Sequence, residues 1–125
     1  MVEVKGIRFR YDQASPAMDF PDFSCEQGER VLLLGNSGTG KTTLLHMLCG
    51  LLTPESGSIR VADLDLTQAS DRTLDAWRGR DVGIVFQQAH FVQSLTMEEN
   101  LALPHQLAQG AVPAEVLDRM GAMLD

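Results

Sequence analysis

Basic residues are scarce in this sequence, and they form no cluster. Seventeen acidic residues stand against ten lysines and arginines, which gives a formal net charge of −7 at pH 7. A surface that binds nucleic acid normally carries a block or stripe of positive charge along the phosphate backbone. The sequence has no such block, so we expect no nucleic acid among its partners.

Cysteine is almost absent as well. Cys25 and Cys49 are the two cysteines, and neither belongs to a Cys-x-x-Cys pair or to a cysteine and histidine spacing. A disulfide framework or a structural zinc site requires such a spacing. We therefore expect two reduced, packed thiols. The three histidines, His46, His90 and His105, have no mutual metal spacing either, and we expect them to be surface or packing residues.

Hydrophobic runs long enough to cross a bilayer are also missing. The most apolar stretch, residues 44–52, contains a histidine and a glycine and is much shorter than a membrane-spanning helix. The opening residues alternate charged and apolar side chains and do not form the apolar core of a secretory signal. We expect a chain that stays in the cytoplasm where it is made and does not insert into a membrane, so any membrane association must go through a partner protein.

The hydrophobic residues that are present predict strands. The chain has 125 residues, 44% of them hydrophobic, which is enough for one globular domain. Residues 2–10 alternate at period two, which predicts a half-buried strand, and residues 17–25 predict a second strand that pairs with it. The unbroken apolar runs at 31–34 and 82–86 predict strands buried on both faces of a parallel sheet. The first of these runs should lie at the centre of the fold.

Helical patterns lie between these strands and after the last of them. Apolar residues at three- and four-residue spacing, together with turn signals, predict helices over 41–52, 71–79, 97–103 and 114–124 and a further strand over 58–66. Thr96 and Glu99 fit a capping box at the start of the third helix, because each side chain can bond the other residue's backbone N–H. Pro113 suits the first turn of the fourth. The sequence therefore predicts an α/β protein.

A glycine-rich segment joins the first apolar run to the helix after it. The segment matches Gly-x-x-x-x-Gly-Lys-Ser/Thr at every fixed position, and its residues are Gly35, Asn36, Ser37, Gly38, Thr39, Gly40, Lys41 and Thr42. Gly38 and Gly40 allow a curled backbone whose N–H groups form a nest for phosphate, next to the positive end of a helix. Lys41 can reach the β- and γ-phosphates, the Thr42 hydroxyl can ligate Mg²⁺, and Thr43 can donate to a further phosphate. The segment predicts a nucleotide site.

The motif and its surroundings resemble the ATP-binding subunit of ABC transporters. Leu-Leu-His at 44–46, Thr-Pro-Glu-Ser-Gly at 53–57 and Leu-Thr-Met-Glu-Glu-Asn-Leu at 95–101 are most similar to ATPases of the lipoprotein-releasing and macrolide-export type. The resemblance implies the N-terminal portion of the phosphate-loop NTPase fold in its ABC form. Residues 1–87 would be the nucleotide-binding core with its antiparallel β part, and 88–125 the Q-loop and the start of a helical subdomain, within one partial domain.

The same resemblance implies roles for two residues outside the loop. Tyr11 stands where the family places an aromatic ring that stacks on adenine, although a half-buried tyrosine at a strand end is the alternative. Gln87 lies in a Val-Phe-Gln-Gln segment that is similar to the Q-loop, where it would contact Mg²⁺ and the attacking water and act with Lys41 in catalysis. An exposed glutamine pair is the alternative there. Asp63 stands at a turn where the family usually has glycine, and aspartate tolerates a left-handed turn.

Other family motifs are missing from these 125 residues. We find no Leu-Ser-Gly-Gly-Gln signature, no apolar strand ending in Asp-Glu and no switch histidine after them. The resemblance implies ATP and Mg²⁺ as cofactors, a second ATPase subunit in a homodimer, and a transmembrane permease whose transport uses the energy of ATP. We expect this chain to bind Mg-ATP, to hydrolyse little of it alone, and to self-associate through exposed apolar strand edges.

Two other functions are compatible with the phosphate loop. A small-molecule kinase also begins with strand, loop and helix, but it needs an arginine-bearing lid, and Arg72, Arg78 and Arg80 lie in a segment that the ABC resemblance covers. A non-catalytic module that binds nucleotide or a membrane subunit without hydrolysis is the other alternative.

Overall fold

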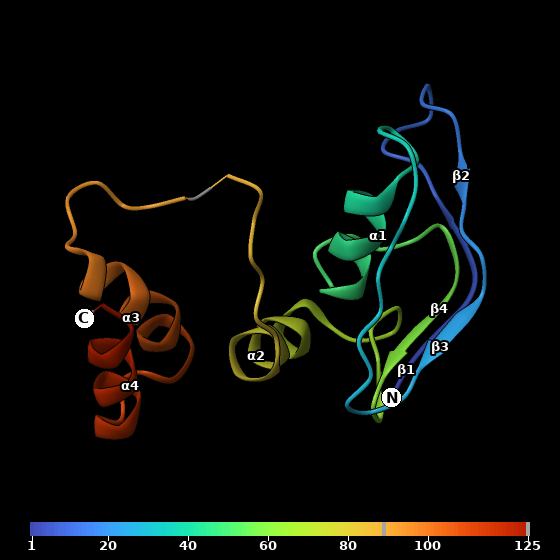
Figure 1. Ribbon diagram of the computed structural model, residues 1–125. Helices are drawn as coiled ribbons and strands as arrows, with labels where there is room; N and C mark the ends of the chain where they lie inside the picture. The colour runs from blue at the N-terminus through green and yellow to red at the C-terminus, as the bar shows by residue number, and fades with distance from the viewer. Residues whose placement is uncertain (89, 125) are drawn as a thin grey trace. The chain divides into compact units, whose positions relative to one another are not determined.

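The computed structural model describes residues 1–88 and 90–124, and these divide into two compact units (Figure 1). The first unit runs from Met1 to Leu74 and contains the β-sheet, and the second begins at Asp75 and is helical. In the described part of the chain, no helix is long and apolar enough to cross a membrane. The expected single partial domain with a division after residue 87 stays a prediction.

An antiparallel sheet forms the body of the first unit. Its strands are β1 (Val2–Phe9), β2 (Met18–Asp19), β3 (Phe23–Cys25), β4 (Ser56–Val61) and β5 (Leu64–Asp65). The order is β2-β1-β4-β5, and β3 also pairs with β1. The strand predicted over 2–10 and its pairing with residues 17–25 are confirmed, although the partner consists of two short strands. The strand predicted over 58–66 is a hairpin of β4 and β5.

A close approach of two glycines shapes the pairing of β1 with β4. The register shifts between Lys5 and Arg8, and Gly6 has a left-handed φ of 57°. A Cβ atom on Gly57 would lie 2.5 Å from the carbonyl carbon and oxygen of Gly6. The irregularity at Gly6 therefore requires that position 57 carry no side chain.

The turn between β4 and β5 differs from the sequence prediction. Ala62 has a φ of 51°, and it is the one non-glycine residue with positive φ in the described part of the chain. Asp63 was expected to tolerate a left-handed turn in place of the family's glycine, but it does not take the left-handed angle. The two residues between Val61 and Leu64 share the turn, and the first of them carries the left-handed angle.

Helix α1 (Lys41–Leu48) lies beside the sheet in Figure 1 and contributes to its core. Val4 and Ile7 of β1, Ile59 of β4 and Met47 of α1 are the largest fully buried side chains. The helix was predicted to reach residue 52, but it ends earlier because Gly50 takes a left-handed φ of 65°. The N–H groups of the following residues then bond back to carbonyls of the last turn, as is common at helix ends.

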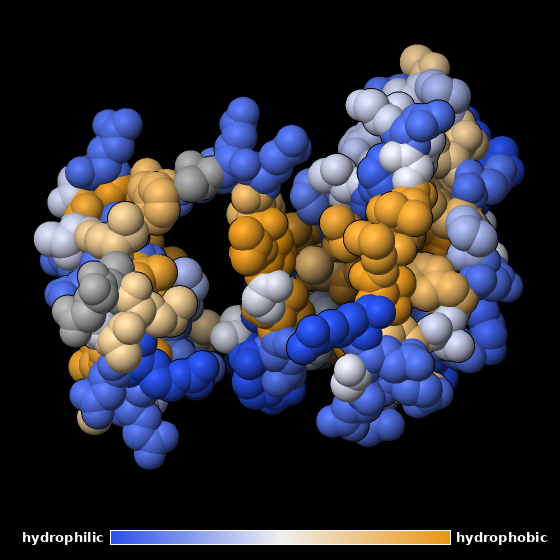
Figure 2. Space-filling model, in the orientation of Figure 1, coloured by the Kyte–Doolittle hydropathy of each residue, from blue (hydrophilic) through white to orange (hydrophobic). Residues whose placement is uncertain are grey.

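The apolar segments 31–34 and 82–86 are not strands, so the prediction of two buried parallel strands is wrong for this structure. Both segments lack regular secondary structure, and Val31, Leu34 and Val85 are 56%, 83% and 99% exposed. A strand buried on both faces needs hydrogen-bonded neighbours, and among residues 1–88 and 90–124 no strand pairs with either segment. Figure 2 shows hydrophobic residues at the surface of the molecule.

The second unit contains α3 (Met97–Gln109) and α4 (Ala114–Leu124), which pack against each other. The capping box is confirmed, because Thr96 Oγ1 accepts from the Glu99 N–H while the Glu99 carboxylate accepts from the Thr96 N–H. Helix α3 continues through Pro104, beyond the predicted end at 103, and its C-cap is Gly110 with a φ of 83°.

Helix α2 (Asp71–Asp81) begins in the first unit and continues into the second, and it contains Trp77, which is buried. Gly79 lies in its last turns, where a Cβ atom would lie 2.5 Å from the Cβ of Ala108 on α3. The absence of a side chain at Gly79 thus allows the two helices to approach closely.

Candidate functional site

Two left-handed glycines shape the glycine-rich loop that precedes α1. Gly38 and Gly40 have φ angles of 83° and 88°, which confirms that both positions need glycine for the curled backbone. At Gly40 space is limiting as well, because a Cβ atom would lie 3.1 Å from the ring of Phe20 and 3.2 Å from the sulfur of Met18. The loop therefore depends on glycine both for its angles and for its packing against residues near β2.

The same glycine leaves the start of α1 without a side-chain cap. Gly40 is the N-cap residue, and no side chain bonds to the first N–H groups of the helix. The first turn also contains no acidic residue. The first N–H groups of an α-helix have no partner within the helix, and the macrodipole places partial positive charge there. This helix end therefore suits an anionic ligand.

The loop itself is closed by hydrogen bonds among its own atoms. Thr39 Oγ1 donates to the Asn36 carbonyl at 2.8 Å, and a Cβ atom on Gly35 would lie 2.8 Å from the same hydroxyl. A side chain at position 35 would thus displace Thr39. The first fixed glycine of the motif thus leaves room for the Thr39 side chain and its hydrogen bond to Asn36.

Lys41 places its positive charge at the loop. Its Nζ donates to the carbonyl oxygens of Gly35 and Asn36 at 2.7 Å each and lies 3.4 Å from Thr39 Oγ1. Two neutral carbonyls are weaker partners for an ammonium group than a phosphate oxygen is. The ammonium, the left-handed glycines and the uncapped helix start together fit a polyphosphate.

An open pocket lies on one flank of the loop, and most of its lining is apolar. The lining residues are Phe20, Pro21, Leu33, Leu34, Gly35, Thr39, Lys41 and Leu44. Phosphate groups need hydrogen-bond donors and positive charge, which the apolar part of this lining does not supply. A polyphosphate would therefore lie against the loop backbone and the start of α1 rather than among these side chains.

The structure brings Tyr11 to the same helix. Thr43, the third residue of α1, is only 5% exposed, and its hydroxyl lies 2.7 Å from the Tyr11 hydroxyl. The Tyr11 ring meets the Phe9 ring edge to face, with centroids 4.9 Å apart and an angle of 88° between the planes. Tyr11 remains 61% exposed, more than the half-buried alternative implies. Sequence reasoning placed Tyr11 and Thr43 in the site but missed the hydrogen bond between them.

Gln87 lies in the second unit, outside any helix or strand, and is exposed. The ring of its neighbour Phe86 meets the ring of His90 edge to face, with centroids 5.5 Å apart. Ala89 and Asp125, which fall in the predicted helical part, lie outside the described residues. The proposed roles of Gln87 toward Mg²⁺ and water stay predictions.

Sequence reasoning missed Asn100, which holds the segment before α3. Its Oδ1 accepts from the Val92 N–H at 2.7 Å, and its Nδ2 lies 3.1 Å from the Val92 and Leu95 carbonyls and 2.8 Å from the Thr96 carbonyl. The position of Asn100, one residue after the capping box, is the signal that could have identified it. Its side chain thus fixes the chain between the predicted Q-loop and α3.

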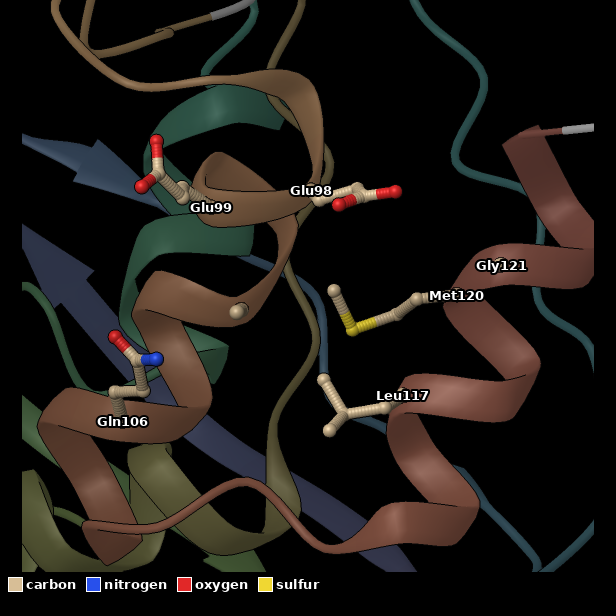
Figure 3. Close-up of a pocket in the computed structure, with 7 residues that line it drawn as sticks. Glu98, Glu99, Gln106, Leu117, Met120 and Gly121 are labelled. Carbon is tan, nitrogen blue, oxygen red and sulfur yellow. The ribbon is translucent and has the colours of Figure 1, made fainter.

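A second pocket lies between α3 and α4, within the second unit (Figure 3). In Figure 3, Leu117 and Met120 extend from α4 into the space between the helices, and Glu98 and Gln106 come from α3. The pocket is open and combines apolar side chains with the two carboxylates of Glu98 and Glu99 and the amide of Gln106.

The sequence profile of the ABC transporter family matches residues 19–124. The lipoprotein-releasing system ATP-binding protein LolD of Cytophaga hutchinsonii is 39% identical over 88 residues, which cover 70% of this chain and 40% of that protein. LolD of Idiomarina loihiensis is 36% identical over 113 residues, covering 90% and 49%. The methionine import ATP-binding protein MetN of Rhizobium etli is 37% identical over 112 residues, covering 90% and 30%. The chain thus spans less than half of the length of these three relatives.

Solved structures agree with this result. The dimeric structure of a post-hydrolysis state of the ATP-binding cassette MJ0796, bound to ADP and Pi, matches with a TM-score of 0.85 and 28% identity, over 99% of this chain and 56% of that chain. A second dimeric structure of MJ0796, a bacterial ABC transporter cassette, matches with a TM-score of 0.82. The predicted phosphate-loop NTPase fold in its ABC form is therefore confirmed, and the similarity to lipoprotein-releasing ATPases reappears among the relatives. Because the family profile covers most of the sequence, this chain belongs to the ABC transporter family and is homologous to its ATP-binding domains.

Proposed function

We propose that this chain binds Mg-ATP as the nucleotide-binding part of an ABC transporter subunit. The observation that carries the proposal is the loop before α1. Two glycines there hold left-handed angles, the first N–H groups of the helix have no side-chain cap, and the Lys41 ammonium lies against the loop carbonyls. These are the groups that a polyphosphate needs, gathered within a few residues.

Each residue of the loop has a part in this proposal. The backbone N–H groups of Asn36, Ser37, Gly38, Thr39, Gly40, Lys41, Thr42 and Thr43 would surround the phosphates, and Gly35 would begin the loop. Lys41 would exchange its carbonyl partners for oxygens of the β- and γ-phosphates. Thr42 is exposed at the start of α1, where its hydroxyl would ligate Mg²⁺. Bound Mg²⁺ would neutralise phosphate charge.

Base recognition and catalysis extend the proposal beyond the loop. Tyr11 would stack on adenine, since most of its surface is exposed. Gln87 would orient water through its amide, which donates and accepts without adding charge. We expect negligible hydrolysis by these 125 residues alone, because we find no carboxylate here that matches the family's catalytic base. A turnover comparable to that of a longer relative would contradict this expectation.

The partners of the whole protein are part of the proposal too. Since ABC ATP-binding proteins act in transport, we propose a transmembrane permease as one partner and a second ATPase subunit as the other. The MJ0796 cassette is dimeric in its solved structures, which supports the second partner. The protein would then lie in the cytoplasm, peripheral to the inner or plasma membrane, and couple ATP binding and hydrolysis to transport.

We also expect this chain to self-associate. Most of the apolar side chains of residues 31–34 and 82–86 are exposed, namely those of Val31, Leu32, Leu34, Ile84, Val85 and Phe86. Exposed apolar segments without strand partners favour association. Sedimentation velocity at tens of micromolar should show species larger than a monomer. Leu34→Lys or Val85→Lys should shift the distribution toward monomer. A single sharp monomer boundary for the unsubstituted chain would contradict the expectation.

Calorimetry with a matched pair of lysine variants tests nucleotide binding. The chain contains two lysines, Lys41 in the loop and Lys5 on β1, where it forms an ion pair with Glu3. Lys41→Ala should abolish the heat of Mg-ATP binding, while Lys5→Ala removes the same charge and should retain it. Equal losses in the two variants would show nonspecific attraction of the nucleotide and refute the site. Circular dichroism spectra verify that both variants remain folded.

A further inference from the structure

We propose that the Thr43 side chain is a positioning residue for base recognition. Its hydroxyl holds the Tyr11 ring in the orientation in which the ring accepts a nucleotide base, and does not serve the phosphates. The inference rests on the proposed nucleotide-binding function, and it assigns the Thr43 hydroxyl to the base side of the site. The Thr43 backbone N–H stays available to the phosphates.

Two adjacent threonines at the start of α1 lie in opposite environments. Thr42 is exposed, whereas Thr43 is 5% exposed. Successive residues of a helix point in directions about 100° apart, so the two hydroxyls cannot serve the same ligand atoms equally. The Thr43 hydroxyl is already engaged with the Tyr11 hydroxyl at 2.7 Å. The geometry therefore assigns the Thr42 hydroxyl to phosphate or metal and the Thr43 hydroxyl to the Tyr11 ring.

The Tyr11 ring is held at two points, and most of its surface is exposed. Its edge contact with Phe9 fixes it to the end of β1, and its hydroxyl is fixed to α1 through Thr43. Phe9 is buried, so the first anchor belongs to the core of the sheet. With both ends fixed, Tyr11 still remains 61% exposed. The ring thus presents free surface in a defined orientation.

A ring that is already fixed loses less conformational entropy when it binds a base. A mobile aromatic side chain must give up rotamer freedom when a base stacks on it, and a ring already fixed has given it up on folding. Thr43 also lies in the helix whose first N–H groups face the loop, so the hydrogen bond joins the base platform to the phosphate site. We therefore expect the contact to raise the affinity for nucleotides that carry a base, but not for a bare polyphosphate.

Calorimetry with two ligands tests the assignment. Thr43→Val and Tyr11→Phe each remove one hydroxyl from the pair and keep the shape of the side chain. Each should weaken Mg-ATP binding by about three- to tenfold, as loss of one hydrogen bond implies. The double variant should lose no more than either single variant, because both remove the same contact. Binding of Mg-tripolyphosphate should be unchanged in all three, and Thr43→Ser should restore ATP affinity.

The neighbouring threonine supplies the matched control. Thr42→Val makes the same chemical change one residue earlier and should weaken ATP and tripolyphosphate alike. If Thr43→Val behaves like Thr42→Val, the Thr43 hydroxyl serves the phosphates and the inference is overturned. Unchanged ATP affinity in Thr43→Val also overturns it. If the unsubstituted chain binds neither ligand, the proposed function fails, and the inference fails with it.

A measurement without ligand separates positioning from general damage. Tyr11 is the only tyrosine, so selective ¹³C labelling of tyrosine rings reports on this ring alone in NMR relaxation experiments. The order parameter of the ring should fall in Thr43→Val and stay unchanged in Thr43→Ser and Thr42→Val. An unchanged order parameter in Thr43→Val would overturn the inference even if ATP affinity fell.

Discussion

Replacing Gly57 with alanine should destabilise the sheet far more than replacing Gly28. Both residues have positive φ angles, 92° at Gly57 and 87° at Gly28, so alanine is strained at either position. The space around them differs. A Cβ atom at position 57 would lie 2.5 Å from backbone atoms of Lys5 and Gly6, whereas a Cβ atom at position 28 meets nothing within 4 Å. A comparison of Gly57→Ala with Gly28→Ala therefore separates the cost of backbone strain from the cost of steric overlap.

The expected magnitudes follow from these two contributions. A left-handed backbone angle costs a residue with a Cβ about 1–2 kcal/mol, which is the whole effect expected for Gly28→Ala. Overlap with packed neighbours adds about 1–3 kcal/mol. At position 57 the neighbours are backbone atoms of β1, which cannot move without breaking its pairing with β4. Gly57→Ala should thus cost about 2–5 kcal/mol, a large share of the roughly 5–15 kcal/mol that stabilises a typical domain.

Urea denaturation followed by amide NMR signals of β1 and β4 measures the effect. A probe within the sheet is needed because two compact units need not unfold together, and Trp77, the single tryptophan, lies in the second unit. If Gly57→Ala lowers the free energy of unfolding by no more than Gly28→Ala does, the close approach of positions 6 and 57 is not a constraint on the sheet. The register shift in β1 would then need another explanation.

Three further perturbations test other parts of the structure. Asn100→Ala should accelerate hydrogen exchange of the Val92 amide, while Asn100→Asp keeps the acceptor oxygen and should preserve its protection; equal exchange in both variants would contradict the contact. The hydrogen bonds from the Thr67 hydroxyl and backbone N–H, together with the charge of Arg60, lower the pKa of Asp65 below its ordinary value of 3.8. The ionised Asp65 carboxylate therefore stabilises the fold above that pH. This stabilisation is lost as the pH falls through the lowered pKa of Asp65. Thr67→Val should therefore lower the urea midpoint at neutral pH and make little difference in strong acid, and a constant difference across the range would refute the linkage. Gly40→Ala should abolish Mg-ATP binding in calorimetry, since the residue is left-handed and packed against a ring; retained affinity would show that the loop does not need its observed angles.

Local signals in the sequence predicted the backbone of the glycine-rich loop and the capping box well. The glycine spacing predicted left-handed angles at Gly38 and Gly40, and the angles are present. Thr96 and Glu99 predicted their reciprocal hydrogen bonds, and both bonds are present. These features depend on residues a few positions apart, so the sequence contains nearly all the information that determines them. The turn after β4 shows the limit, because neither Ala62 nor Asp63 has the strong preference that glycine has.

Contacts between distant residues could not be predicted in the same way. Tyr11 and Thr43 are 32 positions apart, and their hydrogen bond requires β1 and α1 to be in place first. Hydroxyl-bearing residues are common, so no pattern in the sequence singles out this pair. Asn100 differs in part, since its position after the capping box marks the residue, but the partners of its four hydrogen bonds lie in a segment without regular structure. In both cases the tertiary structure determines which group becomes the hydrogen-bond partner, and the residue type determines only that a hydrogen bond can form.

The two apolar runs show that the residues of a segment do not by themselves determine whether it forms a strand. Residues 31–34 and 82–86 have the composition of buried parallel strands, but periodicity and composition describe only how such a segment behaves once its neighbours exist. Backbone N–H and C=O groups without a sheet partner bond to water, and the apolar side chains then stay at the surface, as Leu34 and Val85 do here. The loop that follows residue 34 nevertheless keeps its left-handed glycines and its Lys41 contacts. In this structure the glycine-rich loop and α1 thus have their local geometry although the segment in front of them is unpaired.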